Sequence, residues 1–266
     1  MNDNYLPETI RKFVGTEKYT ADKIGESDSE VRIYDNFVLK IQPQSPETDN
    51  EDHIVKWLNG RLPVPSIPAY EIHNGLAYTL MTKAEGKMLC DMDYLQKPEL
   101  VIDIAARGLK MLWETDVSDC PYSVSRLTNR LKAAEYNVTY GLVDIENTEP
   151  ETFGDGGFKN PEELLEWLIN NRPPEDIVLT HGDYCLPNIF AKGDSISGFI
   201  DLGKAGPADR WQDIAIAIRS LDHNFGGRYT DGKRIFDFKP QMLLDALGIG
   251  MNEEKYRYYI LLDELF

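Results

Sequence analysis

The feature that most constrains this chain is the stretch from Thr180 to Asp201, which reads THGDYCLPNIFAKGDSISGFID. The apolar residues 177–179 come directly before it and predict a short buried strand. This strand would deliver His181, Gly182 and Asp183 into a loop at its end. The sequence therefore predicts polar residues held at the end of a strand, an arrangement typical of an active site.

A β-hairpin is predicted directly after this loop, over residues 189–192 and 196–200, with a glycine-containing turn between them. The hairpin ends on Asp201. Because it folds back on itself, it would bring Asp201 close to Asp183 and Asn188. Two carboxylates and one amide oxygen would then converge near the strand end.

Phosphoryl transfer from a magnesium–nucleotide complex needs such a cluster. One carboxylate orients or deprotonates the attacking hydroxyl, while an Asn and a second Asp hold metal ions on the phosphates. The alternative is a tight loop in which Asp and Asn side chains only satisfy backbone groups. An isolated His-Gly-Asp would favour that alternative, whereas the spaced Asn and the Asp-Leu-Gly after the hairpin favour phosphotransfer.

A second pair of charged residues lies in an apolar context nearer the N-terminus. Alternation in the strand predicted over residues 37–41 places Val38 and Lys40 on one face, opposite the larger apolar side chains. Glu51 lies on the apolar side of a helix predicted over residues 47–59. An ion pair between Lys40 and Glu51 would position the ammonium group on phosphates; alternatively, the lysine extends to solvent.

The wider pattern predicts an α+β chain of two lobes, residues 1–82 and 83–266. Strands expected over residues 18–24, 30–34 and 37–41, and a hairpin over 69–81 with an Asn-Gly turn suited to type I′, form the first lobe with one helix. Helices dominate the second lobe. They are expected over residues 99–113, 124–137, 161–169, 210–221, 239–247 and 253–265.

Composition narrows the possible partners. Asp and Glu number 45 against 28 Lys and Arg, giving a net charge of −17. This charge argues against nucleic acid and favours a cationic ligand, although an acidic surface kept for solubility explains it equally well. No apolar run is long enough to span a membrane, and the first residues lack a signal peptide. Three widely spaced cysteines, Cys90, Cys120 and Cys185, indicate reduced thiols and a cytoplasmic protein.

The chain resembles the aminoglycoside 3′-phosphotransferase (kanamycin kinase) family, whose members have a protein-kinase-like two-lobed fold. The resemblance runs nearly end to end and rests on WLNGRLPVP (57–65), DCPY (119–122), HGDYCLPNIF (181–190), GFIDLGKAGPADRWQDIA (198–215) and YYILLDELF (258–266). The HGD-x4-N and ID-L-G patterns also occur in choline and other small-molecule kinases. The LPVP, DCPY and terminal DELF blocks are more specific to this family.

The resemblance implies roles for the central stretch. Asp183 would be the catalytic residue facing the antibiotic hydroxyl, and Asn188 and Asp201 would hold two magnesium ions. His181 and Asp213 match positions that brace the catalytic loop, so they are expected to be structural.

The resemblance also implies a nucleotide site. Lys40 would contact the α- and β-phosphates of ATP, and Glu51 would pair with it. Ser27 and nearby amides, in a turn that is a weak motif by itself, would cap the β-phosphate. Backbone groups at Thr82 and Ala84 would read the adenine edge.

Val38 departs from the family pattern. Related enzymes carry a tyrosine at this position, stacked on the base. Valine keeps the apolar contact but loses the aromatic face, so GTP is a possible alternative to ATP.

On the substrate side, residues 140–166 contain eight acids and one lysine. Aminoglycosides carry several ammonium groups, so their site needs carboxylates. This segment matches the family's antibiotic-binding region, and the terminal Asp263, Glu264 and Phe266 carboxylate match ligand positions. A charged terminal helix is more often only solvated. The remaining substrate-binding candidates are Lys204, Glu146 and Glu149.

These observations predict an ATP-dependent aminoglycoside 3′-O-phosphotransferase that confers antibiotic resistance, as a monomer or a dimer. A choline kinase would need aromatic residues around a quaternary ammonium, and the segment is acidic instead. A catalytically dead binding module would be expected to lack one of the four residues Lys40, Asp183, Asn188 and Asp201, and all four are present.

Overall fold

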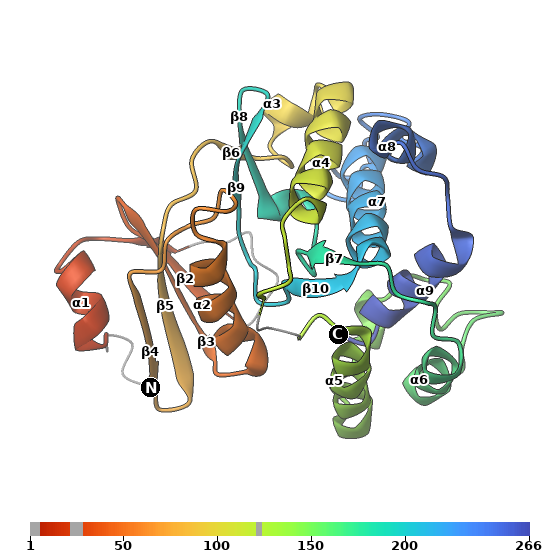
Figure 1. The fold of residues 1–266 in the computed structure, drawn as a ribbon, viewed down its shortest axis with the longest axis horizontal. Helices are drawn as coiled ribbons and strands as arrows, with labels where there is room; N and C mark the ends of the chain where they lie inside the picture. The colour runs from red at the N-terminus through yellow and green to blue at the C-terminus, as the bar shows by residue number, and fades with distance from the viewer. Residues whose placement is uncertain (1–5, 22–28, 121–123) are drawn as a thin grey trace.

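The computed structural model describes residues 6–21, 29–120 and 124–266 (Figure 1). Its N-terminal part is an antiparallel sheet in which five strands lie in the order β1-β2-β3-β5-β4. A helix lies on each side of this sheet (Figure 1). The elements are α1 (Glu8–Val14), β1 (Thr20–Ala21), β2 (Glu30–Ile33), β3 (Phe37–Pro43), α2 (Pro46–Leu58), β4 (Ala69–His73) and β5 (Leu76–Thr82).

Strand β3 separates an apolar face from a polar one, as its alternation predicts. Leu39 and Ile41 are buried in a small core with Ile10 and Val14 of α1. Lys40 points to the other side, where α2 packs. The side chains of α2 continue into the larger core of the C-terminal part. Helix α2 therefore connects the sheet to the rest of the molecule.

Turn and cap residues set the boundaries of these elements. Asn74 and Gly75 both have positive φ, 52° and 77°, so the type I′ hairpin predicted between β4 and β5 is confirmed. Ser45 forms a capping box with Thr48 at the start of α2, which satisfies two amide groups that the helix cannot pair itself. The sheet and its helix are thus defined by local sequence.

The C-terminal part is mainly helical. Strand β7 pairs with β10, and β8 lies between β6 and β9. Helix α7 packs against α9, and α4 against α8. The elements are β6 (Lys87–Met88), α3 (Met92–Leu95), α4 (Pro98–Trp113), α5 (Leu127–Tyr140), α6 (Pro161–Asn170), β7 (Ile177–Thr180), β8 (Ile189–Lys192), β9 (Ser195–Phe199), β10 (Gly206–Asp209), α7 (Arg210–Gly226), α8 (Pro240–Leu247) and α9 (Glu253–Asp263), with 3₁₀ turns η1 (Ile145–Asn147) and η2 (Leu186–Asn188).

Most predicted elements are confirmed, and the differences have physical reasons. Helix α7 continues past residue 221 because Phe225 is buried and extends its apolar face; it ends before Gly227, which has φ 101°. Helix α5 begins three residues later than predicted, at Leu127. Strand β10 was not predicted, because a sequence rich in Gly and Pro forms it only through its pairing with β7. Residues 22–24 of the first predicted strand lie outside the described residues.

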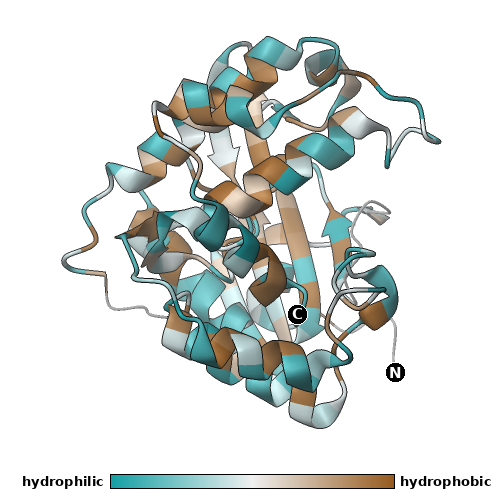
Figure 2. Ribbon diagram, turned by 90° about the vertical axis from the view of Figure 1, so that its right-hand side faces the viewer, coloured by the Kyte–Doolittle hydropathy of each residue, from teal (hydrophilic) through white to brown (hydrophobic). Residues whose placement is uncertain are grey.

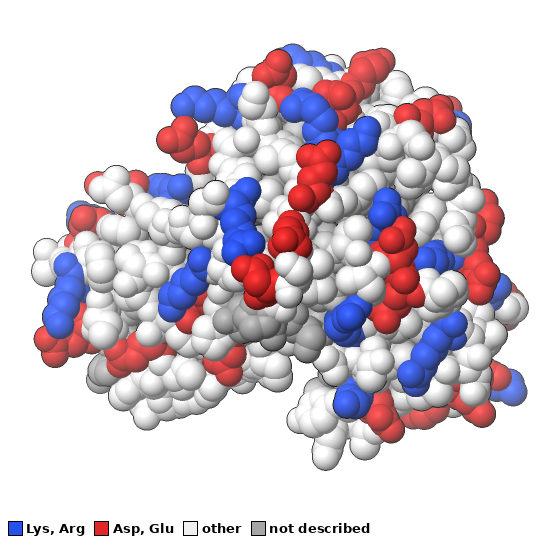
Figure 3. Space-filling model, in the orientation of Figure 1, with Lys and Arg blue, Asp and Glu red and all other residues white. Residues whose placement is uncertain are grey.

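The helices of the C-terminal part carry apolar and polar stripes, so each buries one face (Figure 2). On the face shown in Figure 3, acidic and basic side chains are interspersed, and no patch of one sign covers it.

In the described part of the chain, every helix falls short of the length and apolarity that a membrane span requires.

Candidate active site

The first turn of α7 holds the loop that follows β7 in place through hydrogen bonds. Asp213 is fully buried, and its carboxylate accepts hydrogen bonds from the backbone N–H groups of His181 (2.6 Å) and Gly182 (2.9 Å). Burial raises the pKa of Asp213 to about 7, although these two N–H groups act in the opposite direction. Gly182 has φ 84°, and a Cβ there would lie 2.2 Å from the carbonyl oxygen of Lys204. The loop is therefore fixed in one conformation.

The ring of His181 is also part of this support. It is buried edge-on against Tyr184 and Phe199. Burial lowers the pKa of His181, so its imidazole is neutral at physiological pH. This packing supports the structural assignment that the sequence analysis made.

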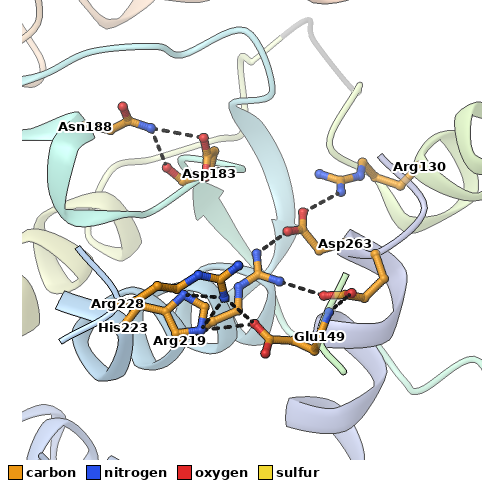
Figure 4. Close-up of polar contacts among 9 residues, drawn as sticks. Arg130, Glu149, Asp183, Asn188, Arg219, His223, Arg228 and Asp263 are labelled. Carbon is orange, nitrogen blue, oxygen red and sulfur yellow. Dashed lines mark hydrogen bonds and ion pairs between the residues drawn. The ribbon is translucent and has the colours of Figure 1, made fainter. Parts of the chain in front are cut away.

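Asp183 and Asn188 lie side by side at the end of the loop (Figure 4). Asn188 belongs to η2, and its Nδ2 donates to the Asp183 backbone oxygen and to Oδ2, both at 3.1 Å. Its amide oxygen points away from Asp183. The amide group thus orients the carboxylate and leaves an oxygen for another partner.

Asp201 connects this loop with the sheet, because the backbone N–H of the preceding Ile200 donates to the Asn188 carbonyl (3.0 Å). Lys40 Nζ of β3 lies 2.7 Å from Asp201 Oδ1 and 3.6 Å from Glu51 Oε2. Glu51 Oε1 in turn accepts from the backbone N–H of Leu202 (3.1 Å). The predicted ion pair of Lys40 and Glu51 is therefore confirmed, and a contact with Asp201 extends it.

The electrostatics keep Lys40 and Asp201 charged, whereas burial raises the pKa of Glu51 above its usual value. Burial acts to lower the pKa of Lys40, but the negative charges of Glu51 and Asp201 outweigh it and raise that pKa above its usual value. Burial raises the pKa of Asp201, but Lys40 more than reverses this, so the net shift is downward. The Asp201 side chain is still 48% exposed, which leaves it open to a further ligand.

Around the C-terminus, the predicted substrate carboxylates are already paired with arginines (Figure 4). Asp263 forms ion pairs with Arg219 and, at 3.5 Å, with Arg130. Glu264 pairs with Arg219 at 3.1 Å and accepts from the backbone N–H of Glu149 at 2.7 Å. Burial acts to raise the pKa of Asp263, but the nearby positive charges outweigh it and lower the pKa below its usual range.

Phe266 and Lys204, the aromatic and the basic candidate for substrate binding, lie close to each other beside this cluster. The Phe266 ring lies under the guanidinium of Arg130, 4.2 Å from the ring centroid, and near the ammonium of Lys204, at 5.6 Å. Lys204 also contributes to the low pKa of Asp263. Phe266 and Lys204 are thus brought to the carboxylates predicted with them.

A cavity of about 1400 Å³ opens beside this cluster, between α6, α7, α9 and the loop before α6. Arg219 and Glu149 line it at the end nearest the C-terminal cluster. Its acidic lining residues are Glu149, Glu151, Asp155, Glu163, Glu166 and Asp222. Glu146, by contrast, lies on the exposed turn η1 and is absent from the described lining residues.

The residues predicted to contact adenine are partly engaged in contacts within the protein. The N–H of Thr82 donates to the backbone oxygen of Ser66 (2.9 Å), so this donor is not available to a base. Ala84 is partly buried beside Gly198, where an added Cβ would lie 2.9 Å from the Ala84 Cβ. Val38 is partly buried on the Lys40 side of β3. Ser27 lies outside the described residues.

The sequence analysis missed the cations that hold the acids in place. Helical spacing contained a signal for one pair: Arg219 and His223 are four residues apart on α7 and share a face. Arg130, from a different helix, had no such signal. The pairing of Asp263 with two arginines could not be read from the terminal DELF block.

Together, a lysine–glutamate pair on the sheet side and an Asp, Asn and Asp cluster on the loop side define a phosphotransferase of the kinase-like class. Residues 18–241 match the family described as "Phosphotransferase enzyme family". An aminoglycoside 3′-phosphotransferase of Enterococcus faecalis is 37% identical over 94% of this chain and 95% of its own. One of Niallia circulans is 37% identical over 98% and 97%.

Solved structures show the same fold. An aminoglycoside 3′-phosphotransferase of type VIII superposes with a TM-score of 0.79 over 97% of this chain and 98% of its own, at 24% identity. Its likeness, together with the sequence relatives, supports the kinase-like α+β fold expected from the sequence. The chain belongs to the aminoglycoside 3′-phosphotransferase family.

Proposed function

We propose that the chain transfers the γ-phosphate of ATP to the 3′-hydroxyl of kanamycin- and neomycin-type aminoglycosides, with Asp183 as the catalytic residue. The observation that carries this proposal is the 2.7 Å contact of Lys40 with Asp201. This contact supports the proposal because Lys40 is suited to bind phosphates, and Asp201 follows Ile200, whose N–H donates to the Asn188 carbonyl. In this proposal residues 1–82 form the nucleotide lobe and residues 83–266 the catalytic and substrate-binding lobe.

Asp201 and Asn188 are suited to hold magnesium. Their oxygens are the hard ligands that this ion prefers, and Mg²⁺ usually takes only one or two protein carboxylates together with phosphates and water. The Asn188 oxygen points away from Asp183 although the residue is mostly buried, and the Asp201 side chain is half exposed. When bound, the ion would neutralise charge on the transferred phosphoryl group.

The chain's own residues account for the remaining chemistry. Asp183, oriented by Asn188, receives the hydrogen bond of the substrate hydroxyl and takes its proton as the oxygen–phosphorus bond forms. The bond between the γ-phosphorus and the bridging oxygen breaks, and ADP leaves. Lys40, kept charged by Glu51, binds the α- and β-phosphates and positions the reacting group in line.

The acidic cavity suits a polycationic acceptor. Six acids line it, whereas its basic lining residues are Arg219, His223 and Arg257. A Streptomyces rimosus aminoglycoside phosphotransferase with the same fold (TM-score 0.77, 22% identity) was solved with ADP and streptomycin. We infer that the amino sugars of the substrate extend from Asp183 toward this cavity, and that Asp263, Glu264 and the Phe266 carboxylate bind ammonium groups along the way.

The cysteines support a cytoplasmic compartment. Cys90 and Cys185 are free thiols and partly buried. We therefore expect the enzyme to act in the reducing cytoplasm.

Replacing Val38 with Tyr is expected to tighten ATP binding by about 0.5–1.5 kcal/mol, the usual gain from an aromatic pair beyond area burial. Val38 lies on the face of β3 that carries Lys40, where the purine would bind. Calorimetric titration with ATP and GTP measures the effect, and Ile72→Tyr, at an exposed position of the edge strand β4, is the control. Unchanged or weaker ATP affinity in a folded variant would show that the base does not stack at this position.

Replacing Asp263 with Asn is expected to raise the aminoglycoside KM at least tenfold, because a charge-assisted contact of about 1.5–3 kcal/mol is lost. The change also releases Arg219 and Arg130, whose positive charges would repel the substrate. The KM for ATP should stay within about twofold, since the phosphate site is untouched. Steady-state kinetics with kanamycin measure both constants.

Asp237→Asn is the matched control, because Asp237 also holds two basic residues, Arg234 and Lys239, but on an exposed loop. Thermal unfolding of each variant separates lost binding from lost structure. An aminoglycoside KM that is unchanged in folded Asp263→Asn would remove Asp263 from the substrate site.

A coupled assay of ADP release tests the proposed function. Kanamycin, amikacin, lividomycin and choline are compared as acceptors. We expect turnover with kanamycin and none with choline. Turnover with choline alone would contradict the assignment.

A further inference from the structure

One acid of the cavity, Glu149, is held by two basic side chains from the end of α7. His223 Nε2 lies 3.1 Å from Glu149 Oε1, and Arg228 Nη1 lies 3.5 Å from the same oxygen (Figure 4). Glu149 and His223 line the cavity. The backbone N–H of Glu149 is bound to Glu264, so the residue is fixed beside the C-terminal cluster.

The backbone turns directly after α7, so that Arg228 lies beside the ring of His223. Gly227 ends α7 in the left-handed region, and a Cβ there would lie 2.8 Å from the carbonyl carbons of Gly232 and Lys233. The turn lets the N–H of Arg228 donate to the His223 carbonyl (3.1 Å). Arg228 Nη1 then lies 3.5 and 3.2 Å from the two imidazole nitrogens. A glycine is therefore required to direct this arginine toward the cavity.

Charges around Glu149 point to Arg228 as its counter-ion. Burial is the main influence on the pKa of His223 and lowers it. The positive charges of Arg228 and Arg219 act in the same direction, and the negative charges of Glu149 and Asp222 act in the opposite direction. The imidazole is therefore neutral at physiological pH.

The ion pair of Arg228 with Glu149 is also loose. Its 3.5 Å separation is long, and the Arg228 side chain is 46% exposed. Glu264, in contrast, is only 3% exposed and lies 3.1 Å from Arg219. An exposed, long ion pair is weak and readily exchanged.

We propose that Arg228 is an internal counter-ion that competes with an ammonium group of the substrate for Glu149, and that it thereby sets aminoglycoside affinity. The inference rests on the proposed function, because it assumes a polycationic acceptor in the cavity. Binding requires the fraction of molecules in which Glu149 is released, so the apparent dissociation constant rises as the pair becomes more populated. For an exposed pair of ordinary strength this increase is about two- to sixfold.

The test is a calorimetric titration of the full-length protein with kanamycin and with neomycin. Arg228→Gln is expected to lower the dissociation constant about two- to sixfold, with unchanged ATP affinity. Arg234→Gln removes the same charge from the same segment but pairs with Asp237, so it should leave the constant near the wild-type value. In a Glu149→Gln background, Arg228→Gln should bring no further gain, because the competition has already been removed.

An unchanged or weaker affinity in Arg228→Gln would overturn the proposal. So would an equal gain in Arg234→Gln, which would indicate only a general change in charge, or a gain that persists without Glu149. ADP release is measured separately on the wild type. A wild type that binds kanamycin without phosphorylating it would contradict the proposed function and leave the competition result valid.

Discussion

Replacing Asp183 with Asn is expected to reduce kcat by roughly two to four orders of magnitude, the range lost with a general base or an orienting group. The carboxylate is already aligned by the Asn188 amide, so asparagine would replace an acceptor with a donor at that contact. ATP affinity should barely change, because Lys40 and Asp201 remain in place. Steady-state kinetics with kanamycin measure kcat, and calorimetry measures ATP binding.

Asp194→Asn is the matched control for this experiment. Asp194 lies in the exposed turn between β8 and β9 and interacts there with Ser195 and Arg107, away from the site. It should retain wild-type kcat. Near-normal kcat in folded Asp183→Asn would remove Asp183 from the centre of the mechanism.

Replacing Asp213 with Ala is expected to cause the second largest effect, on both stability and turnover. The substitution leaves the N–H groups of His181 and Gly182 buried without an acceptor, at a cost of about 1–3 kcal/mol each. Freed from this support, the loop would misplace Asp183, and a displacement of about 1 Å can cost about a hundredfold in rate. Chemical denaturation measures the free energy of unfolding, and kinetics measure kcat.

Asp213 acts here as a positioning residue, so its conservative variant is informative. Asp213→Asn retains one acceptor oxygen and should recover part of both losses. Asp222, on the same helix, lines the cavity but does not contact the loop, so Asp222→Asn should keep the wild-type free energy of unfolding. Full stability in Asp213→Ala would show that the loop does not depend on this carboxylate.

Local patterns were sufficient to predict the pairing of Lys40 with Glu51 and the hairpin that leads to Asp201. Alternation placed Lys40 on the inner face of β3, helical spacing placed Glu51 opposite it, and the structure confirms their ion pair. The hairpin that returns Asp201 toward the loop was also predicted, because its strands and turn lie within one short stretch. Each of these contacts follows from periodicity over a few residues.

The substrate side could not be predicted in the same way. The family resemblance implied ammonium-binding roles for Asp263 and Glu264, but nothing in the sequence indicated that Arg219 pairs with both or that Glu264 contacts Glu149. These partners are far apart in sequence, and no period relates them. Strand β10 was missed for the same reason, since only tertiary pairing makes a strand of Gly206–Asp209.

Transfer of phosphate to the 3′-hydroxyl of an aminoglycoside can be tested by comparing two acceptors. ADP release is measured with kanamycin and with its 3′-deoxy analogue, which has the same ammonium groups but lacks the acceptor oxygen. We expect sustained ADP release with kanamycin and only the background rate with the analogue, while both compounds bind. Equal ADP release with the two compounds would contradict it.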